Sequence, residues 1–359
     1  MNWINENVPR RVSYACSYVP EEIILAAGLI PRRMIPEPRI SEADAYMHPN
    51  TCYYVKSLMA SVLAGDSSEI DGIILANSCD GMRRLHDLCK QYRGAIPALF
   101  LEVPKKKDPA SIEFFASELR RFAGKLEKEF QRSKVTDERL RTAISMCNNV
   151  RVLMDEIFNL QRLATSSVRG LSVFDLCLEG TSTPVMEFIE KLKSVISESR
   201  EGKASDKERR IVVTGNIIHQ PDLIALIEDS GARVVAMDTC IGSRHYDGLV
   251  KEDSQDPMLA LAERYLMRPS CARMEGIEER FQYLKRLVND SMADGVIYSM
   301  VKFCDHHMYE VPLMRNTFED AGIPFLFIEN DYEWAGLEQM RTRVEAFLAM
   351  AGERRSQNV

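Results

Sequence analysis

One segment of this 359-residue chain occurs twice in related form, and this repeat constrains the fold most strongly. Residues 71–102 read DGIILANSCDGMRRLHDLCKQYRGAIPALFLE, and residues 294–329 read DGVIYSMVKFCDHHMYEVPLMRNTFEDAGIPFLFIE. Residues 20–34 and 220–237 form a second pair, each with a proline, an acid, an apolar face, a glycine and an arginine-containing strand pattern. Repeats of this kind indicate that one structural unit is present in two copies.

Within each copy, short apolar runs of strand length alternate with stretches of helical periodicity. This alternation predicts a parallel sheet with helices on both faces. Residues 105–204 differ, because they contain three long amphipathic stretches and end in the polar run ESREGKASDKERR. The sequence therefore predicts an α/β protein with two Rossmann-like parallel-sheet domains related by duplication, at 1–104 and 205–359, and a helical section inserted between them.

Composition excludes several classes of function. The formal charge of −7 and the pI near 5.6 argue against binding to nucleic acid or to anionic membranes. No apolar run approaches the ~20 residues that span a bilayer. The first eleven residues, MNWINENVPRR, contain no apolar signal core, so we expect a cytoplasmic protein.

The chain has nine cysteines, an odd number, and no CxxC pair. In a reducing compartment, such cysteines are buried thiols, metal ligands or catalytic groups more often than disulfides. Cys79 and Cys304 each follow an apolar run and precede a helix, and ligands of open parallel sheets bind at such strand ends. A helix N-terminus there also stabilises a thiolate.

Six cysteines follow the duplication, with three in each copy, and all are expected in loops. Soft thiolates without matching histidines favour an iron–sulfur cluster over catalytic zinc. The remaining three, Cys89, Cys147 and Cys177, lie in helical or apolar stretches and are expected to be buried small hydrophobes. The six candidate ligands are Cys16, Cys52, Cys79, Cys240, Cys271 and Cys304.

The stretches around these cysteines carry a family resemblance: YACSYVPEEIILAAGLIPRRM, NSCDGMRR, DTCIGSRHYDGLV, KFCD and IPFLFIENDY. In combination they resemble the 2-hydroxyacyl-CoA dehydratase and benzoyl-CoA reductase superfamily, in its D-component type. The resemblance covers nearly the whole chain and is weakest in the helical middle. It implies an oxygen-sensitive iron–sulfur protein of anaerobic metabolism that receives single low-potential electrons from a separate ATP-hydrolysing activator.

Two branches of that superfamily remain open as interpretations. Dehydratase subunits hold one 4Fe-4S cluster on three cysteines, which look like Cys16, Cys79 and Cys304 here, and act with a partner subunit on an acyl-CoA. The double-cubane cluster proteins use six cysteines for two cubanes joined by a bridging sulfide, and these homodimers reduce small molecules. The three additional cysteines make this chain look like the double-cubane branch, an iron–sulfur reductase component.

Several residues after the cysteines are candidates for protonating or contacting a substrate. His306, His307 and Tyr309 follow Cys304, and Arg244 and His245 follow Cys240. The simpler interpretation of the first three is that they are exposed residues at the start of a helix. Two other functions also stay open: a non-catalytic two-lobed ligand-binding protein, which would need no thiols, and a structural zinc site, which would leave the symmetry of the copies unexplained.

Overall fold

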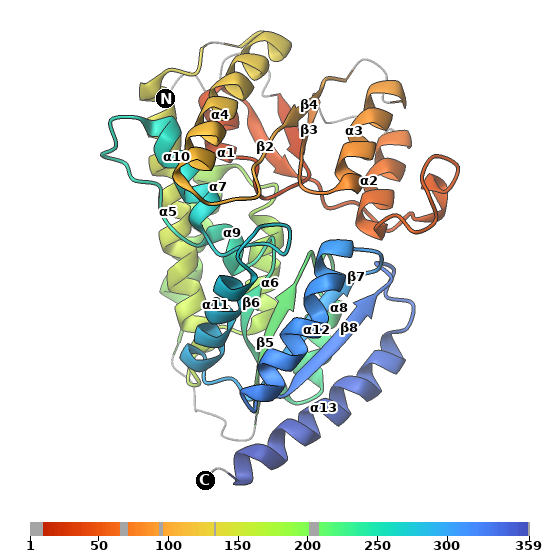
Figure 1. Cartoon of the computed structure of the whole chain (residues 1–359). Helices are drawn as coiled ribbons and strands as arrows, with labels where there is room; N and C mark the ends of the chain where they lie inside the picture. The colour runs from red at the N-terminus through yellow and green to blue at the C-terminus, as the bar shows by residue number, and fades with distance from the viewer. Residues whose placement is uncertain (1–9, 65–70, 93–95, 133, 201–207, 358–359) are drawn as a thin grey trace. The chain divides into compact units, whose positions relative to one another are not determined.

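The computed structural model describes residues 10–64, 71–92, 96–132, 134–200 and 208–357 (Figure 1). The chain divides into two compact units. The first contains Met1–Val152, Gly180–Ile189 and Asp247–Glu275, and the second contains Leu153–Glu179, Glu190–Tyr246 and Gly276–Val359. The domain boundaries at 104 and 204 that the sequence suggested stay a prediction.

The first unit is built on a four-stranded parallel sheet with the strand order β2-β1-β3-β4 in the described residues. Helix α1 packs against α4, and α2 packs against α3. Each connection between parallel strands is a right-handed crossover, so its helix lies on the face set by the direction in which the chain moves along the sheet. The chain moves one way from β1 to β2 and the other way from β2 to β3 and β4. The pair α1 and α4 therefore covers one face of the sheet, and the pair α2 and α3 covers the other. The elements are β1 (Arg11–Tyr14), α1 (Glu21–Ala26), β2 (Ile30–Arg33), α2 (Tyr53–Leu63), β3 (Gly72–Ala76), α3 (Asp80–Tyr92), β4 (Ala98–Leu101) and α4 (Pro109–Phe130).

The second unit repeats this design with the strand order β6-β5-β7-β8, again parallel throughout the described part. Helix α8 packs against α13, and α11 packs against α12, which lies in front of the sheet in Figure 1. The elements are β5 (Arg209–Gly215), α8 (Asp222–Asp229), β6 (Ala232–Asp238), α11 (Ile277–Asp290), β7 (Gly295–Val301), α12 (Asp305–Asp320), β8 (Phe325–Asn330) and α13 (Leu337–Gln357).

The two units therefore share one element order and one sheet topology. The predicted fold class, two Rossmann-like parallel-sheet domains of an α/β protein, is confirmed. One local detail differs from the sequence-based expectation. The pattern of residues 294–329 predicts a strand that reaches Cys304 and a helix that begins at Tyr309. In the structure β7 ends at Val301, three residues before Cys304, and α12 begins at Asp305.

The remaining helices are distributed over both units. The unit boundaries cut α5 between Val152 and Leu153 and α7 between Ile189 and Glu190, so each of these helices contributes to both. Helix α10 packs against α4, and α6 packs against α8 and β6. Their bounds are η2 (Ser41–Ala43), α5 (Asp137–Arg162), α6 (Gly170–Glu179), α7 (Val185–Glu198), α9 (Ser243–Tyr246) and α10 (Pro257–Met267).

Local chemistry accounts for where the elements begin. The Asp108 side chain accepts a hydrogen bond of 2.8 Å from the Ser111 N–H, and Pro109 occupies the first turn of α4, a strong N-terminal signal. After α1, Gly28 adopts a φ of +74°, which a glycine reaches without strain, and the chain turns into β2. These local features explain why the helices of the repeated unit were recognisable in the sequence.

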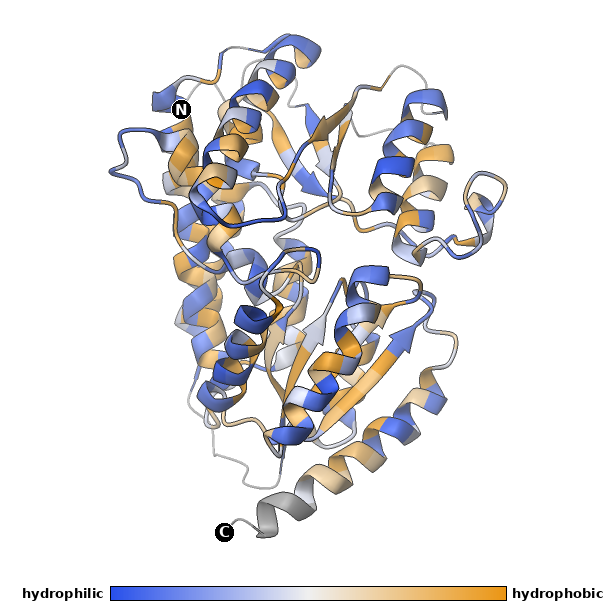
Figure 2. Ribbon diagram, in the orientation of Figure 1, coloured by the Kyte–Doolittle hydropathy of each residue, from blue (hydrophilic) through white to orange (hydrophobic). Residues whose placement is uncertain are grey.

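Each unit has its own apolar core. Strands β3 and β7 are buried along their whole length, as expected for central strands covered by helices on both faces. The edge strand β6 is also buried throughout, and helices α6 and α8 pack against it. Helices such as α3 and α13 carry both hydrophobic and hydrophilic residues (Figure 2). In the part of the chain that the structure describes, no helix combines the length and the hydropathy required to cross a membrane.

The core of the first unit also contains a buried ion pair. Glu22 of α1 is fully buried, and it pairs with Arg151 of α5 and accepts a 2.9 Å hydrogen bond from the Tyr265 hydroxyl. Burial by itself would raise the pKa of Glu22, but Arg151 and Arg264 outweigh it and lower the pKa. The carboxylate therefore remains ionised and joins helices from three separate parts of the sequence.

Candidate functional site

Exposure divides the nine cysteines into the two groups that the sequence suggested. All six candidate ligands are partly exposed, whereas Cys89, Cys147 and Cys177 are buried. Burial raises the pKa of the Cys147 and Cys177 thiols well above the ordinary value, so both stay neutral. The prediction that these three pack as small hydrophobes is confirmed.

Cys79 and Cys304 occupy equivalent turns in the two units. Cys79 lies between β3 and α3, and Cys304 is the N-terminal capping residue of α12 after β7. The Met82 N–H points to the Cys79 sulfur at 3.4 Å, and the Met308 N–H donates to the Cys304 carbonyl at 2.9 Å. Both thiols therefore lie at a helix N-terminus, where the helix dipole favours a negative charge.

Cys16 and Cys52 belong to the same unit as Cys79. Cys16 follows the end of β1 by two residues, and Cys52 is the N-terminal capping residue of α2. The hydroxyl of Tyr54 lies 2.9 Å from the carbonyl oxygen of Ala15 and 2.9 Å from that of Met34. The start of α2 is thereby held against the carboxyl end of β1, next to Cys16.

Cys271 also lies in the first unit, because residues Asp247–Glu275 belong to it. Sequence order had grouped Cys271 with the C-terminal copy. Its backbone N–H lies 3.4 Å from the Tyr18 hydroxyl oxygen, and its side chain packs with that of Cys16 against the same apolar cluster. Four of the six candidate ligands therefore lie in the first unit, and Cys240 and Cys304 lie in the second.

The loop of Cys240 follows β6 and contains a glycine that the fold requires. The Gly242 N–H donates to the side-chain oxygen of Thr239 at 3.0 Å and to its carbonyl at 3.2 Å. A Cβ at position 242 would lie 2.4 Å from the carbonyl oxygen of Met237, closer than side chains approach a backbone oxygen. The tight turn that presents Cys240 therefore depends on a glycine at this position.

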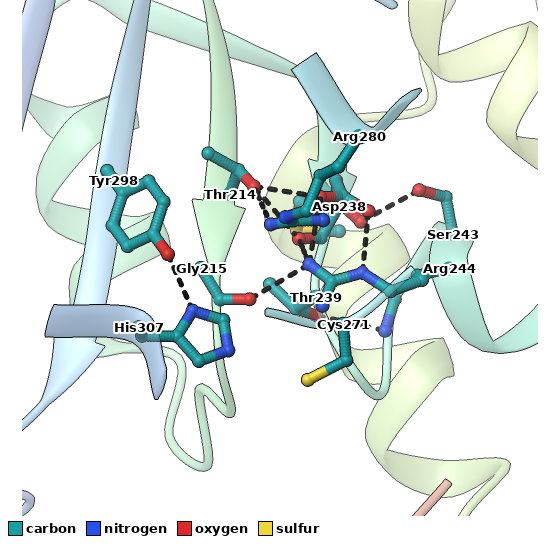
Figure 3. Close-up of polar contacts among 12 residues, drawn as sticks. Thr214, Gly215, Asp238, Thr239, Ser243, Arg244, Cys271, Arg280, Tyr298 and His307 are labelled. Carbon is teal, nitrogen blue, oxygen red and sulfur yellow. Dashed lines mark hydrogen bonds and ion pairs between the residues drawn. The ribbon is translucent and has the colours of Figure 1, made fainter. Parts of the chain in front are cut away.

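A buried network of charges lies at the carboxyl ends of β5 and β6, and β6 ends two residues before Cys240 (Figure 3). Arg244 donates to both carboxylate oxygens of Asp238, at 2.9 and 2.8 Å, and to the carbonyl of Gly215 at 2.9 Å. Arg280 reaches the same carboxylate at 3.2 Å, and Thr214 donates to it at 2.8 Å. Burial alone would raise the pKa of Asp238, but the two guanidinium groups lower it to about 2.

The network continues through Arg280 to Glu310, Tyr298 and His307. Arg280 pairs with Glu310, and the Tyr298 hydroxyl donates to Glu310 at 2.8 Å and lies 2.6 Å from Nδ1 of His307. Burial and the nearby positive charges of Arg280 and Arg244 hold the pKa of His307 well below its usual range. The Tyr298 hydroxyl has a single proton, and it donates this proton to Glu310. Its oxygen therefore accepts a hydrogen bond from His307, so the neutral imidazole carries its proton on Nδ1.

The five predicted substrate-contacting residues differ in their accessibility. Tyr309 is 80% exposed on α12, and His245 and His306 are half-buried. Arg244 and His307 are both 2% exposed and belong to the interior network described above. The expectation that residues 306–309 are simply exposed at a helix start is therefore wrong for His307, because its side chain turns towards Tyr298.

The six candidate ligands offer a set of partly exposed thiols. Among the described residues, no group of three or more His, Cys, Asp or Glu side chains gathers around one point where a metal ion would bind. In an iron–sulfur cubane each thiolate binds a different iron atom, so the ligands surround a volume instead of meeting at a point. The six partly exposed cysteines supply the soft sulfur donors that such a cluster takes.

Sequence reasoning missed the residues that connect the cysteine loops. Tyr18, Tyr54, Arg268 and Arg273 bind these loops in the first unit, and Asp238 organises the network of the second. Each lies within three residues of a candidate cysteine. A search for arginines and tyrosines flanking the cysteines would have found them, although their partners are distant in the sequence.

Comparison with known proteins is consistent with these observations. The (R)-phenyllactyl-CoA dehydratase beta subunit of Clostridium sporogenes is 29% identical over 339 residues, covering 92% of this chain and 88% of that protein. One subunit of the benzoyl-CoA reductase of Thauera aromatica is 26% identical over 356 residues, covering 96% and 92%. The beta subunit of (R)-2-hydroxyglutaryl-CoA dehydratase from Acidaminococcus fermentans is 26% identical over 345 residues, covering 92% and 89%.

These relatives are dehydratase and reductase subunits, as the sequence motifs suggested. The sequence profile of the family described as 2-hydroxyglutaryl-CoA dehydratase, D-component, matches residues 16–351, which is nearly the whole chain. The predicted superfamily is therefore confirmed: this protein belongs to the 2-hydroxyglutaryl-CoA dehydratase D-component family.

Proposed function

We propose that this protein is a low-potential iron–sulfur reductase component that holds a double-cubane cluster and reduces a small-molecule substrate. The proposed ligands are the six partly exposed cysteines. The observation that carries the proposal is the division of the nine cysteines by exposure, with the six at loops and helix starts and the other three buried. A single cubane on Cys16, Cys79 and Cys304 would leave three other partly exposed thiols without a role.

The cluster would supply one chemical capability, the storage and release of single electrons at low potential. The chain's own contribution is to hold the thiolates and to offset their negative charge. Cys52, Cys79 and Cys304 each lie at the N-terminus of a helix of eleven or more residues, where the helix dipole stabilises anionic sulfur. The electron source proposed is a separate ATP-hydrolysing iron–sulfur activator, and the assembly proposed is a homodimer.

Substrate protonation is assigned to the accessible members of the predicted set. His245, His306 and Tyr309 have side chains that water or a substrate can reach. Arg244 and His307 are buried, so we assign them a positioning role, in which they hold the loop after β6 and the start of α12. A general acid has to lie within hydrogen-bond reach of the atom it protonates, which favours the accessible group.

A second candidate function is favoured by the names of the relatives, all of which are subunits of larger enzymes. In this alternative, the chain is the iron–sulfur subunit of a (R)-2-hydroxyacyl-CoA dehydratase, with one 4Fe-4S cluster, an acyl-CoA substrate and a distinct partner subunit. A third alternative, a non-catalytic two-lobed binding protein, gives the six exposed thiols no function.

The deciding experiment is to measure iron and acid-labile sulfide per chain after anaerobic purification of this protein alone. About eight irons per chain would support the double cubane, and about four would favour the single-cluster dehydratase subunit. Zinc, or no metal after reconstitution with iron and sulfide, would contradict the redox proposal altogether.

Cysteine variants separate the two cluster types further. Cys52→Ser and Cys271→Ser should each lose iron if all six cysteines are ligands, whereas Cys89→Ala, at a buried helical position, should keep the wild-type content. Full iron content and activity in either serine variant would refute the six-ligand proposal.

A further inference from the structure

Two buried arginines flank the ring of Tyr18 in the first unit. Arg268 and Arg273 are 4% and 5% exposed, and Tyr18 is 1% exposed. Their guanidinium carbons lie 4.6 and 5.0 Å from the centre of the tyrosine ring, a distance at which a cation is attracted to an aromatic face. We call Tyr18, Arg268 and Arg273 the arginine–tyrosine clamp.

Arg268 binds the loop of Cys16. Its Nη2 donates to the Ser17 carbonyl at 2.8 Å and lies 3.0 Å from the Ser17 hydroxyl. Ser17 directly follows Cys16, and the Val19 N–H closes the same turn by donating to the Cys16 carbonyl at 3.0 Å. Arg268 therefore fixes the backbone that presents this cysteine.

Arg273 binds the loop of Cys79. It donates to the carbonyls of Asn77 and Ser78 at 3.0 and 3.2 Å, and to that of Val103 at 3.0 Å. Ser78 directly precedes Cys79. One guanidinium thus satisfies the carbonyl oxygens beyond the carboxyl ends of β3 and β4, where backbone groups would otherwise need other partners.

The third loop is that of Cys271, which lies between the two arginines in the sequence. The Cys271 N–H donates to the Tyr18 hydroxyl at 3.4 Å, and the Met274 N–H closes the turn by donating to the Cys271 carbonyl at 3.0 Å. Three cysteine loops from distant parts of the chain are therefore held by one ring and two cations.

From this geometry we propose that the clamp positions Cys16, Cys79 and Cys271 as one preorganised group of thiolates and places two positive charges beside the cluster that they bind. The proposal rests on the proposed iron–sulfur function. A nearby cation stabilises the more negative, reduced form of a cluster, so the clamp raises its reduction potential. Partners of metal ligands also control retention of the metal.

Arg273→Gln and Arg273→Lys separate charge from geometry. Gln removes the positive charge, so we expect a more negative midpoint potential and roughly ten-fold faster loss of iron to a chelator. Lys keeps the charge but lacks the planar fork whose Nε and Nη2 reach the three carbonyls, so we expect a potential near the wild-type value and weakened iron retention. Midpoint potentials come from an anaerobic redox titration followed by electron paramagnetic resonance.

Arg264→Gln is the matched control. Arg264 is a buried arginine that stacks on Tyr265 at 4.8 Å and donates to the carbonyls of Asp247 and Gly248, two residues that flank none of the candidate cysteines. It should lower stability without moving the potential. Tyr18→Phe, which removes only the hydroxyl, replaces Arg273→Gln if that variant does not fold, and it should accelerate iron loss.

The outcomes are distinguishable from a failure of the proposed function. A wild-type chain without iron and sulfide after reconstitution would refute the function itself. A wild-type chain that holds the cluster, together with an Arg273→Gln variant whose potential and iron retention match the Arg264→Gln control, would refute the clamp. Unchanged iron retention in Tyr18→Phe would likewise refute the positioning of Cys271.

Discussion

Asp238 offers a quantitative test of the electrostatics described for the second unit. Its carboxylate is fully buried and is bonded by Thr214, Arg244 and Arg280. In Asp238→Asn, the shape is kept but the charge is lost, and an amide N–H replaces one of the two accepting oxygens. Removing one partner of a buried ion pair typically costs about 3–5 kcal/mol, because the buried arginines then lose this counter-charge.

The pH dependence of this contribution follows from the pKa of Asp238. Its value of about 2 in the folded protein lies below the ordinary 3.8, and this difference corresponds to about 2 kcal/mol of folding free energy. Because the folded-state pKa is the lower one, the contribution is fully present above pH 4 and is lost as the pH falls towards 2. The gap in unfolding free energy between wild type and Asp238→Asn should therefore narrow by about 2 kcal/mol over that window.

The assay is urea unfolding of the iron-free chain, followed by circular dichroism at pH 7, 4 and 2.5. Asp253→Asn is the control, because Asp253 lies exposed in a loop. This control should unfold like the wild type at every pH. The reasoning would be wrong if Asp238→Asn stayed within about 1 kcal/mol of wild type at pH 7, or if the gap did not change with pH.

Three further predictions follow from burial and packing. In the iron-free native chain, alkylation at pH 8 should label the six partly exposed thiols, and it should label the three buried thiols only after unfolding. Mass spectrometry maps the labelled cysteines, and rapid labelling of a buried thiol would contradict its placement. Gly242→Ala should lower the free energy of unfolding by about 2 kcal/mol, since the new methyl meets the Met237 carbonyl, and an unchanged urea midpoint would contradict the close approach. Arg151→Met should lower the free energy of unfolding by about 3 kcal/mol, because Glu22 stays buried without its ion-pair partner. The same urea unfolding measures this change, and Arg84→Met, at an exposed position, is the control and should change little.

Much of the architecture could be predicted because its determinants are local. The Asp-Gly turn, the apolar run and the Cys-Asp pair recur in residues 71–80 and 294–305, and both copies form a parallel strand followed by a helix. The exposure of Cys16, Cys79, Cys240 and Cys304 was also foreseeable, since turn positions after buried strands face the open edge of a sheet. Helix α2 and strand β1 were not anticipated, because β1 has only four residues and α2 is buried on almost every side and lacks amphipathic contrast.

The early start of α12 has a similar explanation. The sequence extends the apolar pattern of β7 towards Cys304, but the strand ends at Val301, and Phe303 adopts a φ of +62° that turns the chain. Asp305 then provides an acid in the first helical turn, where it complements the helix dipole. The hydrophobic pattern alone did not predict this turn at Phe303. The turn, with the helix start that follows it, is the reason that His307 faces the interior.

The sequence by itself determined the repeated strand–helix unit, the parallel sheets and the turns that carry the cysteines, because periodicity and turn chemistry act over a few neighbouring residues. Only the tertiary structure decided that Cys271 lies in the first unit and that Arg268 binds Ser17, 251 positions away. It also decided which buried charges meet, such as Asp238 with Arg280. These contacts depend on how helices pack and on where buried carbonyls and carboxylates need partners, and no local pattern specifies a partner so far along the chain.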